Sequence, residues 1–152
     1  MTKTDNATKA LVDNLNTLLA DYFALYLKTK NFHWHVRGPQ FRDLHLLFDE
    51  QAAELFALTD LIAERVRKNG AATLTSIGAI ADKARIKPQD DATLPAEAMI
   101  AELRDDNAAL ITALRETKAL AGAAGDNATD GAIDDWTDQA QQRVWFLSSL
   151  IA

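Results

Sequence analysis

The apolar residues in the N-terminal half of the chain recur every three or four positions, which is the spacing of one face of an α-helix. One series consists of Leu11, Leu15, Leu18, Leu19, Tyr22, Phe23 and Tyr26. It predicts a helix that is capped at Asp5 or Asn6 and runs to about Trp34. A second series predicts a helix from about Pro39 to Lys68, with glycines just outside both ends.

The second half of the chain resumes this pattern after an interruption. Threonine, serine, glycine and proline break the period in residues 71–92, where only a short helix around 76–84 is predicted. A third long helix is predicted from about Pro95 to residues 122–125, and a fourth after a cap at Asp126 or Asn127. The pattern therefore predicts an all-α fold. It is a four-helix bundle with a short extra helix in the connection between the second and third helices.

Composition narrows the class of protein. The chain has 152 residues, 48% of them hydrophobic, and contains no cysteine. We expect one domain over residues 1–152, with a short tail at 1–6 and no thiolate or iron–sulfur chemistry. A net charge of −6 disfavours nucleic acid as the default partner. No long apolar run or signal-peptide pattern is present, so we expect no membrane association and a cytoplasmic location, with nucleoid association left open.

The three histidines of the chain are clustered. His33, His35 and His45 lie within thirteen residues, and the rest of the sequence has none. Clustered imidazoles near carboxylates are typical of a metal site. His35 lies two residues from His33 and points elsewhere on a helix, so we expect it to be exposed, with a peripheral metal role as the alternative.

The second predicted helix carries two pairs of ionisable residues. His45 and Asp49 are four residues apart, as are Asp60 and Glu64, so each pair projects from one helix face. Eleven residues separate Asp49 from Asp60, which is close to three full turns, and all four side chains share one stripe. Ionisable groups on a half-buried stripe are costly unless they are paired or bind a metal.

The rise per residue of an α-helix determines whether the two pairs can bind the same metal ion. Eleven residues span about 16 Å, so the two pairs cannot hold one ion within a single chain. Two copies packed antiparallel about a two-fold axis would place Asp49 opposite Asp60 and His45 opposite Glu64, with His33 as a further ligand. This donor set contains nitrogen and oxygen but no sulfur, and it suits Fe(II), Mn(II) or Zn(II).

Two other interpretations remain open at this stage. The acids of the stripe can instead form surface ion pairs with Arg65, Arg67 or Lys68. The chain can also be a purely structural bundle, in which changing Asp60 or Glu64 affects nothing beyond stability.

A longer motif surrounds these residues. The chain reads HWHVRGPQFRDLHLLFDE from His33 and TDLIAERV from Thr59. These stretches resemble the Dps family of ferritin-like proteins from starved bacterial cells, whose pattern is HW-x-V-x-G-x-x-F-x-x-L-H-x-x-x-D followed by D-x-x-A-E-R. The matching positions are His33, Trp34, Val36, Gly38, Phe41, Leu44, His45, Asp49, Asp60, Ala63, Glu64 and Arg65.

This resemblance implies a ferritin-like bundle and a hollow shell of twelve identical subunits. It implies ferroxidase sites between two-fold related subunits, at which Fe(II) is oxidised, preferably by hydrogen peroxide, before ferric mineral is stored and DNA is thereby protected. The catalytic metal ligands would be His33, His45 and Asp49 of one subunit with Asp60 and Glu64 of its neighbour. Zn(II) is expected as a competitor.

The resemblance also implies roles outside the ligand set. Trp34 lies beside the site in this family and would quench radicals. Family members line a three-fold pore with aspartates near the start of the last helix, where this chain has Asp126, Asp130 and Asp134. The usual pore positions fall on Asn127 and Gly131, however, so a solvated capping cluster is the alternative.

Two related functions are weighed against this one. Ferritins proper use a Glu-x-x-His pair within one bundle, and this sequence has no such motif. Many DNA-binding family members carry a lysine-rich tail, but the N-terminal segment here offers only Lys3 and Lys9. We expect weak or no DNA binding near neutral pH. The alternative is a nucleoid DNA-binding protein with a vestigial iron site.

Overall fold

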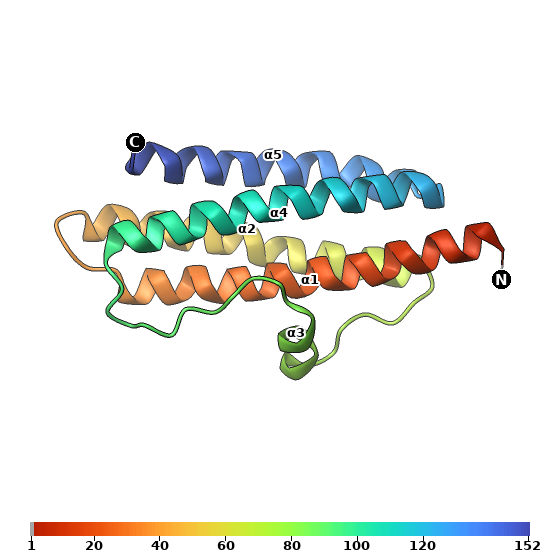
Figure 1. Ribbon diagram of the computed structural model, residues 1–152, viewed down its shortest axis with the longest axis horizontal. Coiled ribbons are helices and arrows are strands. Elements are labelled where there is room, and N and C mark those ends of the chain that lie inside the picture. Colours follow the sequence, from red (N-terminus) through yellow and green to blue (C-terminus); the bar gives the residue numbers. More distant parts are fainter. Residues whose placement is uncertain (1) are drawn as a thin grey trace.

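Four long helices run side by side, and a fifth, short helix lies next to the first (Figure 1). The computed structural model describes residues 2–152, and within that range it contains no strand. The helices are α1 (Lys3–His35), α2 (Phe41–Lys68), α3 (Ile77–Lys83), α4 (Ala96–Ala124) and α5 (Asn127–Leu150). The predicted all-α bundle, with a short helix in the connection between its second and third long helices, is confirmed.

The start of α1 differs from the prediction. The N-cap is Thr2, not Asp5 or Asn6. The Thr2 hydroxyl accepts the backbone N–H of Asp5 at 3.1 Å, and the Asp5 carboxylate accepts that of Thr2 at 3.1 Å. This capping box satisfies two backbone donors, so residues 3–6 form the first helical turn and not a tail. Met1, the remaining residue of the predicted tail, lies outside the described residues.

The other helix boundaries lie close to the predicted ones. A turn that includes Gly38, at φ 117°, joins α1 to α2, and α2 begins at Phe41 instead of Pro39. Helix α4 ends at Ala124 and is capped by Gly125, whose φ of 72° is the left-handed conformation that glycine adopts at helix ends. Helix α5 is capped by Asp126, one of the two predicted caps.

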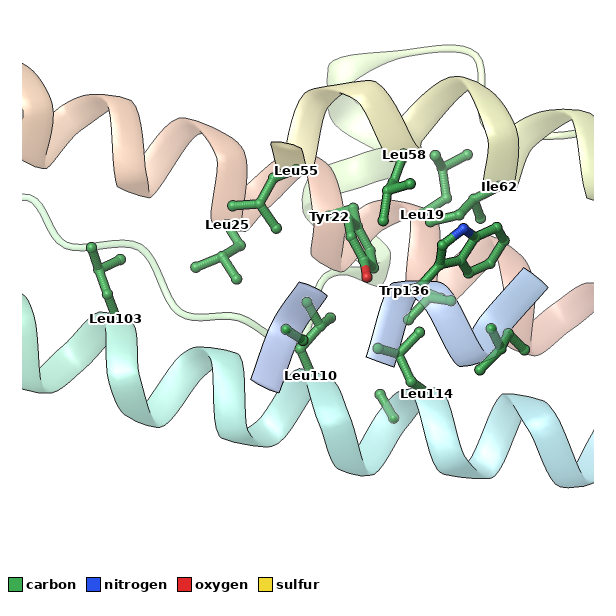
Figure 2. Close-up of a cluster of buried hydrophobic side chains, with 14 of the residues drawn as sticks. Leu19, Tyr22, Leu25, Leu55, Leu58, Ile62, Leu103, Leu110, Leu114 and Trp136 are labelled. Atoms are coloured by element: carbon green, nitrogen blue, oxygen red, sulfur yellow. The ribbon is translucent and has the colours of Figure 1, made fainter. Parts of the chain in front are cut away.

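The inner faces of the four long helices meet in one hydrophobic core (Figure 2). Its buried members include Leu19, Tyr22, Leu25, Leu55, Leu58, Ile62, Leu103, Leu110, Leu114 and Trp136. Burying each large apolar side chain contributes roughly 1.5–3 kcal/mol. The core fixes the rotation of α2 about its axis and therefore determines which side chains α2 turns outward.

A polar cluster interrupts this core. The Arg143 guanidinium is 1% exposed; its Nε donates to Asn107 Oδ1 at 2.7 Å and its Nη1 to Glu54 Oε2 at 3.1 Å. Among the described residues, no side chain or backbone group bonds to the Tyr22 hydroxyl or to either amide atom of Gln51. The centre of the bundle therefore contains polar groups that are only partly satisfied.

The long connection between α2 and α4 is held against α1 by polar side chains. The buried carboxylate of Asp21 accepts the backbone N–H of Arg85 at 2.6 Å and its guanidinium at 2.8 Å. Further along α1, Lys28 Nζ donates to the carbonyl of Lys87 at 3.0 Å. These bonds explain how a segment with little regular structure keeps a defined path.

Candidate metal site

The end of α1 and the start of α2 bring two histidines together. His33 Nδ1 lies 2.6 Å from the backbone carbonyl of His45, and His45 Nδ1 lies 2.7 Å from the carbonyl of His33. The two imidazoles stack with their centroids 3.9 Å apart and an angle of 13° between their planes. We call this reciprocal arrangement the histidine clasp.

The clasp determines which ring nitrogens are free. A carbonyl oxygen can only accept, so Nδ1 of both His33 and His45 carries the proton. In the neutral ring the lone pair then belongs to Nε2, which is the atom available to a metal. An N–H bond to a carbonyl on the far side of the ring is the usual way in which a protein orients a histidine ligand.

Asp49 lies beside the clasp, one turn after His45. Its Oδ1 atom is 3.8 Å from His33 Nε2 and accepts a hydrogen bond from Lys30 Nζ at 2.8 Å. The hydrogen bond from Lys30 lowers the pKa of Asp49, and the charge of Lys30 acts in the same direction. Asp49 is therefore an ionised carboxylate next to a free imidazole nitrogen.

Two side chains next to the clasp, Lys30 and Phe41, were not predicted from the sequence to take part in the site. Lys30 lies one turn before His33, and Phe41 lies one turn before His45, where its ring stacks on the imidazole at 5.0 Å and 25°. The sequence signal for both residues was their position three or four residues before a histidine, because that spacing places two side chains on the same helix face.

The neighbouring residues Trp34 and His35 lie at the edge of the site. Trp34 is 57% exposed, and Lys30 Nζ lies 5.9 Å from its ring centroid, within reach of a cation–π contact. His35 Nδ1 instead approaches the backbone and side-chain oxygens of Asn31 at 2.9 and 2.7 Å. As expected, His35 is exposed.

Asp60 and Glu64 lie on the outer face of α2, in the half of the helix that is distant from the clasp. Both are exposed, and within residues 2–152 neither forms a hydrogen bond or ion pair through its side chain. Because α2 is unbroken from Phe41 to Lys68, eleven residues still correspond to about 16 Å. In the described range, no three histidine or acidic side chains of one chain gather as a metal site.

The ion pairs considered as an alternative do not form in the described structure. Arg65 donates to Asp126 at 2.8 Å and to Thr129 at 2.7 Å, while Arg67 donates to the carbonyl of Ala71. Neither arginine therefore neutralises the acids of the stripe.

Large apolar side chains are exposed along the outer faces of α1 and α2. On α2, Phe56 is 53% exposed and Leu61 is 47% exposed, and Leu46 is exposed nearby in sequence. On the adjacent α1, Leu27 and Trp34 are exposed as well. Concentrated apolar exposure of this kind marks an interaction surface.

The three predicted pore acids lie at the α4–α5 end of the bundle. Asp126 caps α5 and accepts hydrogen bonds from Asn69 and Arg65, each at 2.8 Å. Asp130 and Asp134 share a face, as their spacing predicted, and both form ion pairs with Lys118. Asp126 thus has a capping role within the chain, and the pore role of all three acids stays a prediction.

Within residues 2–152, none of the helices is both long enough and apolar enough to cross a membrane.

Comparison with known proteins places this fold and motif in a family. Residues 12–152 match the family model of the ferritin-like domain. The DNA protection during starvation protein of Brevibacillus brevis is 32% identical over 137 residues, which cover 90% of this chain and 91% of that protein.

Solved structures agree with this match. Dps from Thermosynechococcus elongatus has a TM-score of 0.96 at 30% identity, covering 99% of this chain and 96% of its own. Dps from Vibrio cholerae O1, a member of a broad superfamily of ferritin-like diiron-carboxylate proteins, has a TM-score of 0.91 at 28% identity, covering 97% of this chain and 92% of its own. Since the family model and these relatives span nearly the whole sequence, the chain belongs to the Dps family of ferritin-like proteins.

Proposed function

We propose that this protein detoxifies and stores iron. It oxidises Fe(II), preferably with hydrogen peroxide, at sites between two-fold related subunits and keeps the ferric mineral inside a hollow shell of twelve subunits. The observation that carries the proposal is the histidine clasp: it engages Nδ1 of both rings and leaves Nε2 to a metal, with Nε2 of His33 at 3.8 Å from the ionised Asp49.

The names of the relatives support the coarser part of this function. One is a DNA protection during starvation protein and another is described as a ferritin-like diiron-carboxylate protein. Membership of this family supports iron binding, iron storage and DNA protection in general. The peroxide preference, the twelve-subunit shell and the cytoplasmic location are part of our proposal.

Each chain supplies two half-sites to the assembly. Antiparallel packing of α2 on a second α2, about an axis near residues 54–55, would bring the clasp and Asp49 of one subunit to Asp60 and Glu64 of the next. Ala53 and Ala57, both exposed, leave room for close approach of the two helices. Burial of the exposed Phe56 and Leu61 side chains in this contact would contribute a favourable free energy of association.

The donor set fits iron as the substrate. Two imidazoles and three carboxylates accept Fe(II) and then favour Fe(III), for which anionic oxygen is the better ligand. Two Fe(II) ions give two electrons to one hydrogen peroxide, which takes up two protons and becomes two waters. The side chains set the geometry of the metal and do not themselves transfer protons. Zn(II) would compete for the same ligands.

Protection of DNA is then chemical, because both reactants that form hydroxyl radicals are removed. Direct binding to DNA is expected to be weak. Of the two lysines in the N-terminal segment, Lys9 is already paired with Asp13 at 2.8 Å, and the net charge of the chain is −6. We also propose that Trp34, which is exposed beside Lys30, intercepts radicals that escape.

The proposal is tested by anaerobic Fe(II) loading followed by a pulse of hydrogen peroxide. Near-ultraviolet absorbance would follow the ferric product, and the particle would be sized. We expect rapid oxidation in a twelve-subunit shell for the wild type and loss of that phase in His45→Ala/Asp60→Ala. Equally slow oxidation in both proteins would overturn the ferroxidase assignment.

Mixed assemblies test whether the ligands are shared between subunits. One variant, His33→Ala/His45→Ala, lacks the clasp ligands; the other, Asp60→Ala/Glu64→Ala, lacks the distant acids. When one subunit of each variant forms a two-fold pair, one of the two sites contains every ligand. The other site lacks both the clasp histidines and the distant acids. Co-assembly should therefore restore part of the activity that each variant alone has lost. A site contained in one chain would show no such recovery.

A further inference from the structure

The imidazole of His45 is stacked against two rings. His33 lies against it at 3.9 Å, and Phe41 lies against it at 5.0 Å with an angle of 25° between the planes. Phe41 precedes His45 by one helical turn, so the stack is built into α2 itself. The Phe41 ring is not part of the core, since it is 44% exposed.

A histidine ring needs more than one hydrogen bond to keep its orientation. The outer torsion of a histidine side chain is broad, so the bond from Nδ1 to the His33 carbonyl alone leaves the ring free to rock. An aromatic ring packed against the imidazole restricts that motion.

We propose that Phe41 is a positioning residue for the metal site. Its ring holds the His45 imidazole in the orientation that keeps Nδ1 on the carbonyl of His33 and presents Nε2 outward. Phe41 makes no bond to the metal and acts only through His45. This inference rests on the proposed function in one respect, namely that His45 is a metal ligand.

The energetic consequence follows from preorganisation. A ring that is already ordered loses little freedom when a metal binds, whereas a rocking ring must be ordered at that moment. Loss of the aromatic contact is expected to weaken divalent-metal binding by roughly three- to tenfold, the range of a single aromatic pair. The smaller leucine would keep apolar cover at this position but not the flat stacking surface.

The experiment compares Phe41→Leu with a matched substitution elsewhere. Phe146 on α5 is 36% exposed and also contacts an aromatic neighbour, Trp145, at 5.0 Å. Phe146→Leu thus removes a similar, partly exposed ring from α5, a helix that carries none of the proposed ligands. Co(II) is titrated anaerobically into each full-length protein, and its visible absorption reports both affinity and coordination geometry. Nitrogen NMR of the metal-free proteins reports the tautomer of His45.

We expect Phe41→Leu to bind Co(II) three- to tenfold more weakly and to show mixed tautomers of His45. Phe146→Leu should match the wild type, and Phe41→Tyr, which keeps the ring, should recover both readouts. Unchanged affinity and an unchanged tautomer in Phe41→Leu would overturn the inference, as would an equal loss in Phe146→Leu. If the wild type bound no Co(II), the proposed function would fail, and the tautomer measurement would still decide the role of Phe41.

Discussion

His33 and His45 are each bonded through the side chain to the backbone of the other, at 2.6 and 2.7 Å. The clasp therefore joins α1 to α2 as well as orienting two ligands. We expect His33→Ala to lower the free energy of unfolding of the metal-free protein by about 1–2 kcal/mol, through one lost hydrogen bond and one lost ring contact. Urea denaturation of the metal-free protein would measure this. If His33→Ala were as stable as the wild type, the prediction that the clasp stabilises the contact between α1 and α2 would be wrong.

Lys30 holds the same oxygen of Asp49 that a metal beside His33 would use, at a distance of 2.8 Å. Its ammonium group also repels an arriving cation, an effect of about 1 kcal/mol per unit charge at 4 Å when the groups are fully hydrated. Lys30→Met should therefore raise the affinity for a divalent metal severalfold, with Zn(II) calorimetry as the measurement. Lys9→Met, which removes an ammonium from a pair remote from the site, is the control. Weaker binding by Lys30→Met would instead mean that Lys30 is needed to orient Asp49.

Most of the fold could be predicted from the sequence, because long helices carry a strong three-to-four periodicity. The start of α1 could not, since Asp5 and Asn6 have the residue types of an N-cap, whereas Asp5 is the third residue of the helix and completes a capping box with Thr2. The site was predicted from residue types and spacing within α2. Lys30 was missed because its partner, Asp49, lies on the next helix, and such a contact depends on packing between helices.

Asp126 joins the end of α2 to the start of α5, and its charge is essential to that role. Burial alone would raise its pKa, but hydrogen bonds from Asn69 and Thr129 and the Arg65 guanidinium together hold the pKa of Asp126 far below its usual value. Asp126→Asn keeps the shape but removes the charge. At neutral pH it should lower the free energy of unfolding by about 2 kcal/mol, the usual effect of losing charge-assisted hydrogen bonds.

The sign of the pH dependence follows from the lowered pKa. A carboxyl whose pKa is depressed in the folded state stabilises the protein above its unfolded pKa of about 4, and this contribution disappears as the pH falls towards the folded value. The stability difference between wild type and Asp126→Asn should therefore be constant from pH 7 to 5 and shrink below about pH 4. Thermal unfolding across this range measures it, and a difference that grows on acidification would contradict the assignment.

Gln51 is almost fully buried on the inner face of α2, and neither atom of its amide has a partner among the described residues. A buried amide without hydrogen bonds costs about 1–3 kcal/mol, so replacing it with an apolar side chain of similar length should stabilise the bundle. We expect Gln51→Met to raise the free energy of unfolding by about 1–2 kcal/mol without changing metal binding.

Thr59 serves as the control for that substitution, because it is also buried on α2 but its hydroxyl donates to the carbonyl of Phe56 at 2.6 Å. Thr59→Val removes a hydroxyl that is already satisfied, and should not stabilise the protein. If Gln51→Met were destabilising while Thr59→Val was neutral, the amide of Gln51 would have to be bonded in solution, and internal water between α2 and its neighbours would be the partner to look for.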